Sequence, residues 1–176
     1  MKVSLSILVL LIASPVFAQN KPDITSTVPV CGPDSVRFSV KTESTQHPTG
    51  QADSGKAVIY FLENDDTFDS MPKPTTRMGV DGRWVGATHG DSYFFVSVDP
   101  GEHNLCSEWQ SSVDFSSGHQ AALAHFTANP GGVYFFLVQN SWRMSGVPRV
   151  GMRAISGDEA RLLTSRYSLS TSTQKK

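Results

Sequence analysis

Short runs of apolar residues, separated by glycine, proline and acidic residues, fill most of the chain. Val36–Thr42 alternates strictly between apolar and polar side chains, and this period of two is typical of a half-buried strand. Arg149–Ile155 alternates in the same way, and Ala124–Ala128 is a shorter candidate strand. Runs of this length, repeated with turn residues between them, predict an all-β protein.

Three further runs are apolar on both faces, although a strand with one solvated face alternates. We therefore expect the outer face of the sheet that contains them to be covered by another segment or by a partner. The three runs are Lys56–Glu63, Tyr93–Val98 and Val133–Val138.

Two turns organise the stretch between Val80 and Cys106, which we expect to hold three or four antiparallel strands. Asp81-Gly82, between two short apolar runs, predicts a two-residue hairpin turn. With that turn, Gly79 faces Trp84 across the ladder. The second turn consists of Asp99, Pro100 and Gly101, and the ring of His103 just after it is expected to hydrogen-bond backbone.

One helix is predicted, over Ser156–Ser165. Ser156 and Glu159 have the spacing of a capping box, and Leu162 and Leu163 give the helix a narrow apolar face. We expect this helix to lie across the outer face of the doubly apolar sheet. The remaining segments are predicted as loops: Glu43–Gly55, Asn64–Thr75 and Ser111–Gly118.

These elements predict an all-β fold, an antiparallel β-sandwich of the immunoglobulin-like or prealbumin-like kind, with one short C-terminal helix. The predicted domain organisation is a signal peptide over residues 1–18, an extended leader over 19–35, a single sandwich domain over 36–166 and a polar tail over 167–176.

The first residues have the features of a secretory signal. Lys2 gives a positive end, Leu5–Ile12 is an apolar core too short to span a bilayer comfortably, and cleavage is expected after Ala18. An uncleaved anchor is the alternative. After cleavage no transmembrane helix is expected, and the location is periplasmic or secreted.

The formal net charge of −1 argues against a nucleic-acid partner, which would require a basic surface. Two cysteines in an exported chain most simply form one disulfide, Cys31 to Cys106. Two free buried thiols or an intermolecular bridge are the alternatives.

Several short motifs keep an order and spacing that resemble one family. They are Gly55-Lys56-Ala57-Val58-Ile59-Tyr60, Val80-Asp81-Gly82, Ser92-Tyr93-Phe94, Pro100-Gly101-Glu102-His103 and Gly132-Val133-Tyr134-Phe135-Phe136. Together they resemble the DUF2846 family of exported bacterial domains of unknown function. The resemblance spans about half the chain. It implies a compact β-sandwich outside the cytoplasm, and it implies no reaction because the family has none assigned.

No residue pattern compels a chemistry. His119 and His125 are a possible meeting pair, and with an acid such as Asp114 they would suit a hydrolase. Asp65, Asp66 and Asp69 cluster without the regular spacing of a calcium loop, so a solvated acidic loop is expected. No metal and no cofactor are predicted.

Exposed aromatic residues are the best candidates for binding, because exposed aromatics in β-sandwiches bind peptides or sugars. The candidates are Trp84, Trp109 and Trp142, and core packing is the alternative for each. The leading hypothesis is a non-catalytic exported sandwich that binds an envelope protein, a peptide or a glycan. The rival hypothesis is the hydrolase that would use His119 or His125.

Overall fold

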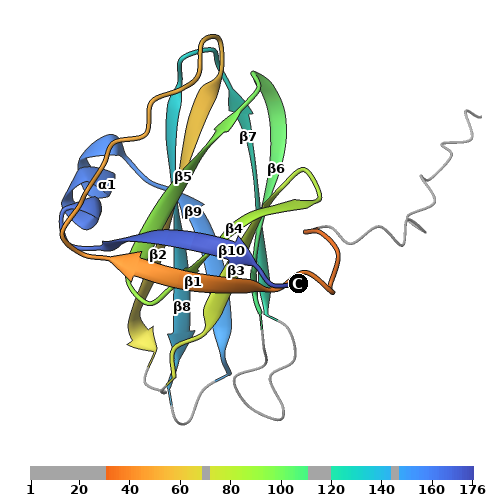
Figure 1. Ribbon diagram of the computed structural model, residues 1–176, viewed down its shortest axis with the longest axis vertical. Helices are drawn as coiled ribbons and strands as arrows, with labels where there is room; N and C mark the ends of the chain where they lie inside the picture. The colour runs from red at the N-terminus through yellow and green to blue at the C-terminus, as the bar shows by residue number, and fades with distance from the viewer. Residues whose placement is uncertain (1–30, 69–71, 111–119, 144–146) are drawn as a thin grey trace, which may run out of the picture.

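The computed structural model describes residues 31–68, 72–110, 120–143 and 147–176. Within them lie ten strands and one helix (Figure 1). The elements are β1 (Phe38–Glu43), β2 (Ala57–Phe68), β3 (Thr75–Val80), β4 (Arg83–His89), β5 (Ser92–Val98), β6 (Gly101–Trp109), β7 (Ala121–Ala128), β8 (Val133–Trp142), β9 (Arg149–Ala154), α1 (Gly157–Thr164) and β10 (Ser168–Gln174).

The strands form two sheets that pack face to face, so the predicted all-β sandwich with one short helix is confirmed. One sheet has six strands in the order β1-β10-β5-β2-β8-β9, and the other has four in the order β4-β3-β6-β7 (Figure 1). Side chains of both sheets meet in the core between them. The fully buried members of this core include Ile59, Phe61, Met78, Leu105 and Val138.

Two strand pairs are parallel, so the prediction of an antiparallel sandwich is wrong for them. β2 runs parallel to β8, and β10 runs parallel to β5. Parallel neighbours need a long connection. Strands β3 to β7 lie between β2 and β8 in the sequence, and all of them except β5 belong to the four-stranded sheet. The chain then returns to the six-stranded sheet, where β8 pairs with β2. This pairing joins segments that are far apart in the sequence. The alternation of apolar and polar residues within one segment therefore does not predict it.

The hairpin turn is confirmed. Asp81 and Gly82 both have positive φ, 51° and 74°, and Gly79 pairs with Trp84 across the ladder. The turn at Asp99 and Pro100 is different, because β5 belongs to the six-stranded sheet and β6 to the four-stranded sheet. This turn therefore connects the two sheets. The prediction that the strands between Val80 and Cys106 follow one another in one antiparallel sheet is wrong.

Strand β2 continues to Phe68, so the loop predicted from Asn64 onward starts too early. Asp65 is 1% exposed and its carboxylate accepts a hydrogen bond from the Asn140 amide, 2.8 Å away. Asn64 donates to the Tyr167 hydroxyl at 2.5 Å. These partners lie far away in the sequence, and they let acidic and amide side chains occupy a buried strand.

The predicted polar tail is also wrong, because Ser168–Gln174 is strand β10, placed between β1 and β5 in the six-stranded sheet (Figure 1). All six residues of β1 pair with it. Ser170 is buried and its hydroxyl donates to that of Ser92 at 2.8 Å. Only Ser168 and Leu169 also pair with β5, so the run of serine and threonine forms a strand here mainly because β1 supplies its backbone partners.

The outer face of the six-stranded sheet is covered, as the doubly apolar strands predicted. Tyr60, Leu62, Tyr93 and Leu137 form a second buried cluster on that face, separate from the inter-sheet core. Leu163 of α1 packs against it, whereas Leu162 is 53% exposed. Ser156 caps the helix as predicted, accepting from the Glu159 amide.

The helix is not the only cover of this face. Tyr167 and Leu169 follow it into the cluster, and Ala52 of the 44–56 connection packs there too. In Figure 1 this connection passes beside α1. The amide of Gly50 donates to the Tyr60 hydroxyl, and Gly50 lies against the ring of Phe95. Two stretches of the chain therefore bury the outer face, residues 157–169 and the 44–56 connection.

Replacing Gly82 by valine should destabilise the domain by roughly 1 kcal/mol or more, because a β-branched side chain is strained at positive φ. Gly151→Val is a matched control, since Gly151 lies in β9 and an added Cβ would have no atom within 4 Å. Urea unfolding of both variants measures the difference. Equal midpoints would contradict the turn.

Deleting residues 168–176 should abolish cooperative unfolding, because the deletion removes an interior strand and leaves β1 without its partner. A whole domain has only about 5–15 kcal/mol of stability. Thermal unfolding followed by circular dichroism checks this, with deletion of Lys175 and Lys176 alone as the control. A shortened chain that melts like the control would show that β10 is dispensable.

Candidate functional site

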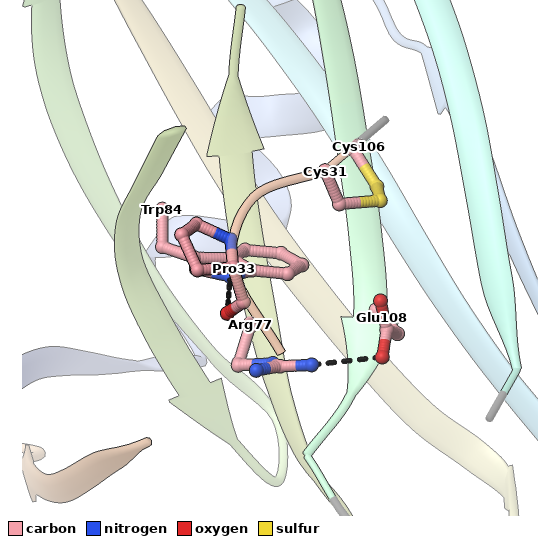
Figure 2. Close-up of a disulfide and its surroundings, with 6 residues drawn as sticks. All are labelled: Cys31, Pro33, Arg77, Trp84, Cys106 and Glu108. Atoms are coloured by element: carbon pink, nitrogen blue, oxygen red, sulfur yellow. Dashed lines mark hydrogen bonds and ion pairs between the residues drawn. A yellow bond between two sulfur atoms is a disulfide. The ribbon is translucent and has the colours of Figure 1, made fainter. Parts of the chain in front are cut away.

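A disulfide fastens the first described residues to the four-stranded sheet. Cys31 is bonded to Cys106 of β6 with their Cα atoms 5.3 Å apart, which confirms the predicted pairing (Figure 2). Residues 31–37, here called the strap, then run over the outer face of this sheet. Gly32 lies against the indole of Trp84 at φ 143°, where an added Cβ would come within 2.8 Å of the ring.

Beneath the strap, Arg77 of β3 is fully buried and donates at 2.8 Å to the Glu108 carboxylate (Figure 2). It also donates to the Val36 carbonyl at 2.6 Å. Its guanidinium carbon lies 4.2 Å from the centroid of the Trp84 ring, which is a cation–π contact. The Trp84 indole N–H donates to the Pro33 carbonyl at 3.0 Å. These groups bind one another and are structural.

The three predicted binding tryptophans therefore do not form one surface. Trp109 is completely buried and donates to the Asn140 amide oxygen at 2.7 Å, so its candidacy as a surface aromatic is wrong. Trp84 is half-buried against the strap. Trp142 is half-buried with its ring centroid 6.0 Å from that of Phe68.

The predicted turn residues meet around His103. Its Nδ1 lies 2.7 Å from an Asp81 carboxylate oxygen and its Nε2 lies 2.7 Å from the Asp99 carbonyl oxygen, so the expected backbone contact is confirmed. Burial opposes a charged ring, but the hydrogen bonds to Asp99 and Asp81 raise the pKa of His103 overall. Protonated His103 therefore ties the hairpin turn to the turn at Pro100 and Gly101.

A cavity of about 250 Å³ lies beside this histidine. Four of the five charged groups that line it already have partners, since Lys56 lies 3.4 Å from Asp99 and His103 pairs with Asp81, and the fifth is Arg83. A ligand there would compete with these pairs, so we do not assign the site to this cavity.

The predicted pair of His119 and His125 is not seen in the described residues. His125 is exposed on β7, the last strand of the four-stranded sheet. His119 and Asp114 lie outside the described residues. Among the residues that the structure does describe, no group of three or more histidine, cysteine or acidic side chains is placed to hold a metal ion.

Two acidic side chains lie inside one end of the sandwich. Glu63 and Asp65 project from β2 into the inter-sheet space, and the Asn140 amide donates to both, at 2.5 Å and 2.8 Å. The Thr76 hydroxyl donates to the same oxygen of Glu63. The second carboxyl oxygen of each acid has no partner among the described residues.

Burial sets the protonation of this pair. It raises the pKa of Asp65 from 3.8 to about 6, against the hydrogen bond from Asn140. Burial and the neighbouring Asp65 carboxyl raise the pKa of Glu63 well above its usual range. Paired carboxyls of this kind can exchange protons with a substrate, but Glu63 and Asn140 are fully buried and Asp65 is 1% exposed. Of the larger cavities among the described residues, none is lined by Glu63, Asp65 or Asn140, so a substrate has no route to these groups and their role is structural.

The outer face of the six-stranded sheet holds the better candidate site. A cavity of about 360 Å³ lies there, between α1 and residues 47–49. Its floor is aromatic, because Tyr60, Tyr93 and Phe135 line it. The Tyr60 ring centroid lies 5.0 Å from that of Phe135 and 6.3 Å from that of Tyr93, the latter nearly parallel at 23°.

The rest of the cavity lining is less apolar. Val133 and Thr164 line its sides, and Arg161 and His47 bring basic groups to it. Tyr93 is 1% exposed, and its hydroxyl has no hydrogen-bond partner among the described residues. Burial raises the pKa of Tyr93, and the nearby Tyr60 hydroxyl adds to this effect, so the phenol stays protonated.

Sequence reasoning did not select these residues as a site. The double-sided apolar pattern of Lys56–Glu63, Tyr93–Val98 and Val133–Val138 was the available signal, and it indicated a covered face. It did not indicate that the cover leaves a cavity, because that depends on how α1 and residues 47–49 sit on the sheet.

Comparisons of the chain with models of protein families, with curated proteins and with solved structures found no match in any of the three. The described part of the chain contains no helix of the length and apolar character that crossing a membrane requires. The site must therefore be interpreted from its own geometry.

We expect the domain to lose stability as the pH rises from about 4 to 8. Between the ordinary and the raised pKa of Asp65, the folded state binds more protons than the unfolded state, so the free energy of unfolding falls over about pH 4–6. A shift of that size corresponds to on the order of 3 kcal/mol. His103 acts in the same direction, because its stabilisation is complete below about pH 6.5 and is lost as the pH rises through its folded-state pKa.

Urea unfolding at a series of pH values separates the two contributions. Asp65→Asn should reduce the fall in stability between about pH 4 and 6, and the raised pKa of Glu63 accounts for the fall that remains. His103→Gln should reduce the loss at higher pH. A wild-type profile that rises between pH 5 and 8 would contradict both assignments.

Proposed function

We propose that this chain is an exported, non-catalytic β-sandwich that binds another component of the cell envelope, with the outer-face cavity as its binding site. The observation that carries the proposal is the cavity itself, which has an aromatic floor and an unpaired buried hydroxyl. Concave, mostly apolar cavities of about 300–1,000 Å³ with a few polar groups are the usual form of a ligand site.

Export is supported by two independent features. The segment ending at Ala18 has the composition of a cleavable signal. The Cys31–Cys106 disulfide is typical of proteins that fold in an oxidising compartment. A periplasmic or secreted location is therefore part of the proposal. The resemblance to the DUF2846 family is kept as a proposal on the order of its motifs, and it adds no reaction.

The absence of catalysis is supported by the state of the candidate groups in the described residues. The Glu63–Asp65 pair is closed to substrate, and His103 is held by Asp81 and Asp99. The hydrolase that would use His119 or His125 gains no support, because exposed His125 faces Asn104 across the ladder and the described residues place no acidic side chain in a hydrogen bond with it.

The test is NMR titration of the mature chain, residues 19–176, with fractions of an envelope extract. We expect at least one fraction to shift amide signals around Tyr60, Tyr93 and Phe135. Val133→Arg should abolish the shifts by filling the cavity, since Val133 lines it and is 48% exposed.

Leu123→Arg is the matched control, because Leu123 is also an exposed apolar strand residue, at 59%, but lies on β7 in the other sheet. It should leave the shifts unchanged. The proposal fails if no fraction shifts the cavity signals, if both variants respond like the wild type, or if a component of the extract is chemically converted.

A further inference from the structure

The chemistry of the cavity lining restricts what can occupy it. Its aromatic floor offers ring faces and edges, which favour a flat apolar body over a branched one. Its volume of about 360 Å³ is near the lower end of the usual range for small-molecule sites, so the occupant is small.

The charge of the lining is one-sided. No aspartate or glutamate is among the described residues that line the cavity, whereas Arg161 carries a permanent positive charge there. The Arg161 guanidinium pairs with Asp158 at 3.3 Å, but both side chains are more than four-fifths exposed, at 81% and 90%. An exposed pair of this kind contributes little, so a ligand anion can compete for the guanidinium.

A second polar group is available at the floor. The Tyr93 hydroxyl is buried and without a partner among the described residues, and its ring lines the cavity. A buried hydroxyl without a partner is unfavourable, and a ligand that supplies a donor or acceptor removes that cost. The Tyr60 hydroxyl, by contrast, already accepts from the Gly50 amide.

We propose that the outer-face cavity binds a small aromatic carboxylate, with its ring on Tyr60 and Phe135, its carboxylate at Arg161 and a second polar group at the Tyr93 hydroxyl. The assignment rests on the proposed function, whose site it shares. It adds the class of ligand, which the envelope extract experiment leaves open.

The probes are 4-hydroxyphenylacetate, phenylacetate, tyramine and hexanoate, each titrated into the full mature chain by NMR. 4-Hydroxyphenylacetate should bind best, about fivefold tighter than phenylacetate, because one hydrogen bond is worth about 1 kcal/mol. Tyramine, which replaces the carboxylate by a cation, should bind at least about threefold more weakly than 4-hydroxyphenylacetate.

Two variants assign the groups. Tyr93→Phe should remove the tighter binding of 4-hydroxyphenylacetate relative to phenylacetate. Tyr134→Phe should keep that difference, because the Tyr134 hydroxyl accepts a hydrogen bond from the Asn129 amide instead. Arg161→Gln should remove the preference over tyramine, and Arg166→Gln, an exposed arginine that does not line the cavity, should keep it. Melting curves of the four variants confirm that each is folded.

The ligand class is overturned if tyramine binds as tightly as the carboxylates, if hexanoate binds as tightly as phenylacetate, or if none of the probes shifts the cavity signals. Each of these results leaves the proposed function standing when an extract fraction still shifts those signals in a Val133-dependent way. Conversely, probe binding without any active fraction supports the ligand class and contradicts the envelope role.

Discussion

The burial of strand β2 on both faces is the constraint on which the rest of the structure depends. Its side chains enter the inter-sheet core on one face and the outer cluster on the other, and residues from Ala57 to Leu62 are at most 6% exposed. Burying a large apolar side chain contributes roughly 1.5–3 kcal/mol. One sandwich core cannot bury both faces, so α1, Tyr167 and the 44–56 connection must cover the second, and the cavity lies under that cover.

The three residues of β2 that follow Leu62 are polar but still buried on both faces, so their side chains need hydrogen-bond partners. Glu63 and Asp65 continue the inward face and are held by Asn140, while Asn64 continues the outward face and bonds to Tyr167. A buried polar group without a partner is costly, so this end of the sandwich depends on specific long-range hydrogen bonds. Its stability consequently depends on protonation.

The four-stranded sheet is stabilised in a different way. The strap covers its outer face over β3, β4 and β6. The disulfide holds the strap to β6, and Arg77 is enclosed beneath it (Figure 2). A buried guanidinium is tolerated because it donates to Glu108 and to the Val36 carbonyl and stacks on Trp84. Each sheet thus has segments packed on its outer face, and in the described residues the cover of the six-stranded sheet leaves an aromatic cavity of about 360 Å³.

The sequence by itself determined the features that depend on neighbours along the chain: the strands, the Asp81-Gly82 turn, the Ser156 cap and the need for a covered sheet. With only two cysteines it also allowed the disulfide to be predicted. Tertiary structure alone decided the parallel pairing of β2 with β8 and the strand formed by Ser168–Gln174. A polar segment of this kind becomes a strand only when a distant segment, here β1, supplies its backbone partners. It also decided the cavity, since Tyr93, Phe135 and Arg161 come together only when distant strands pair and α1 docks across them.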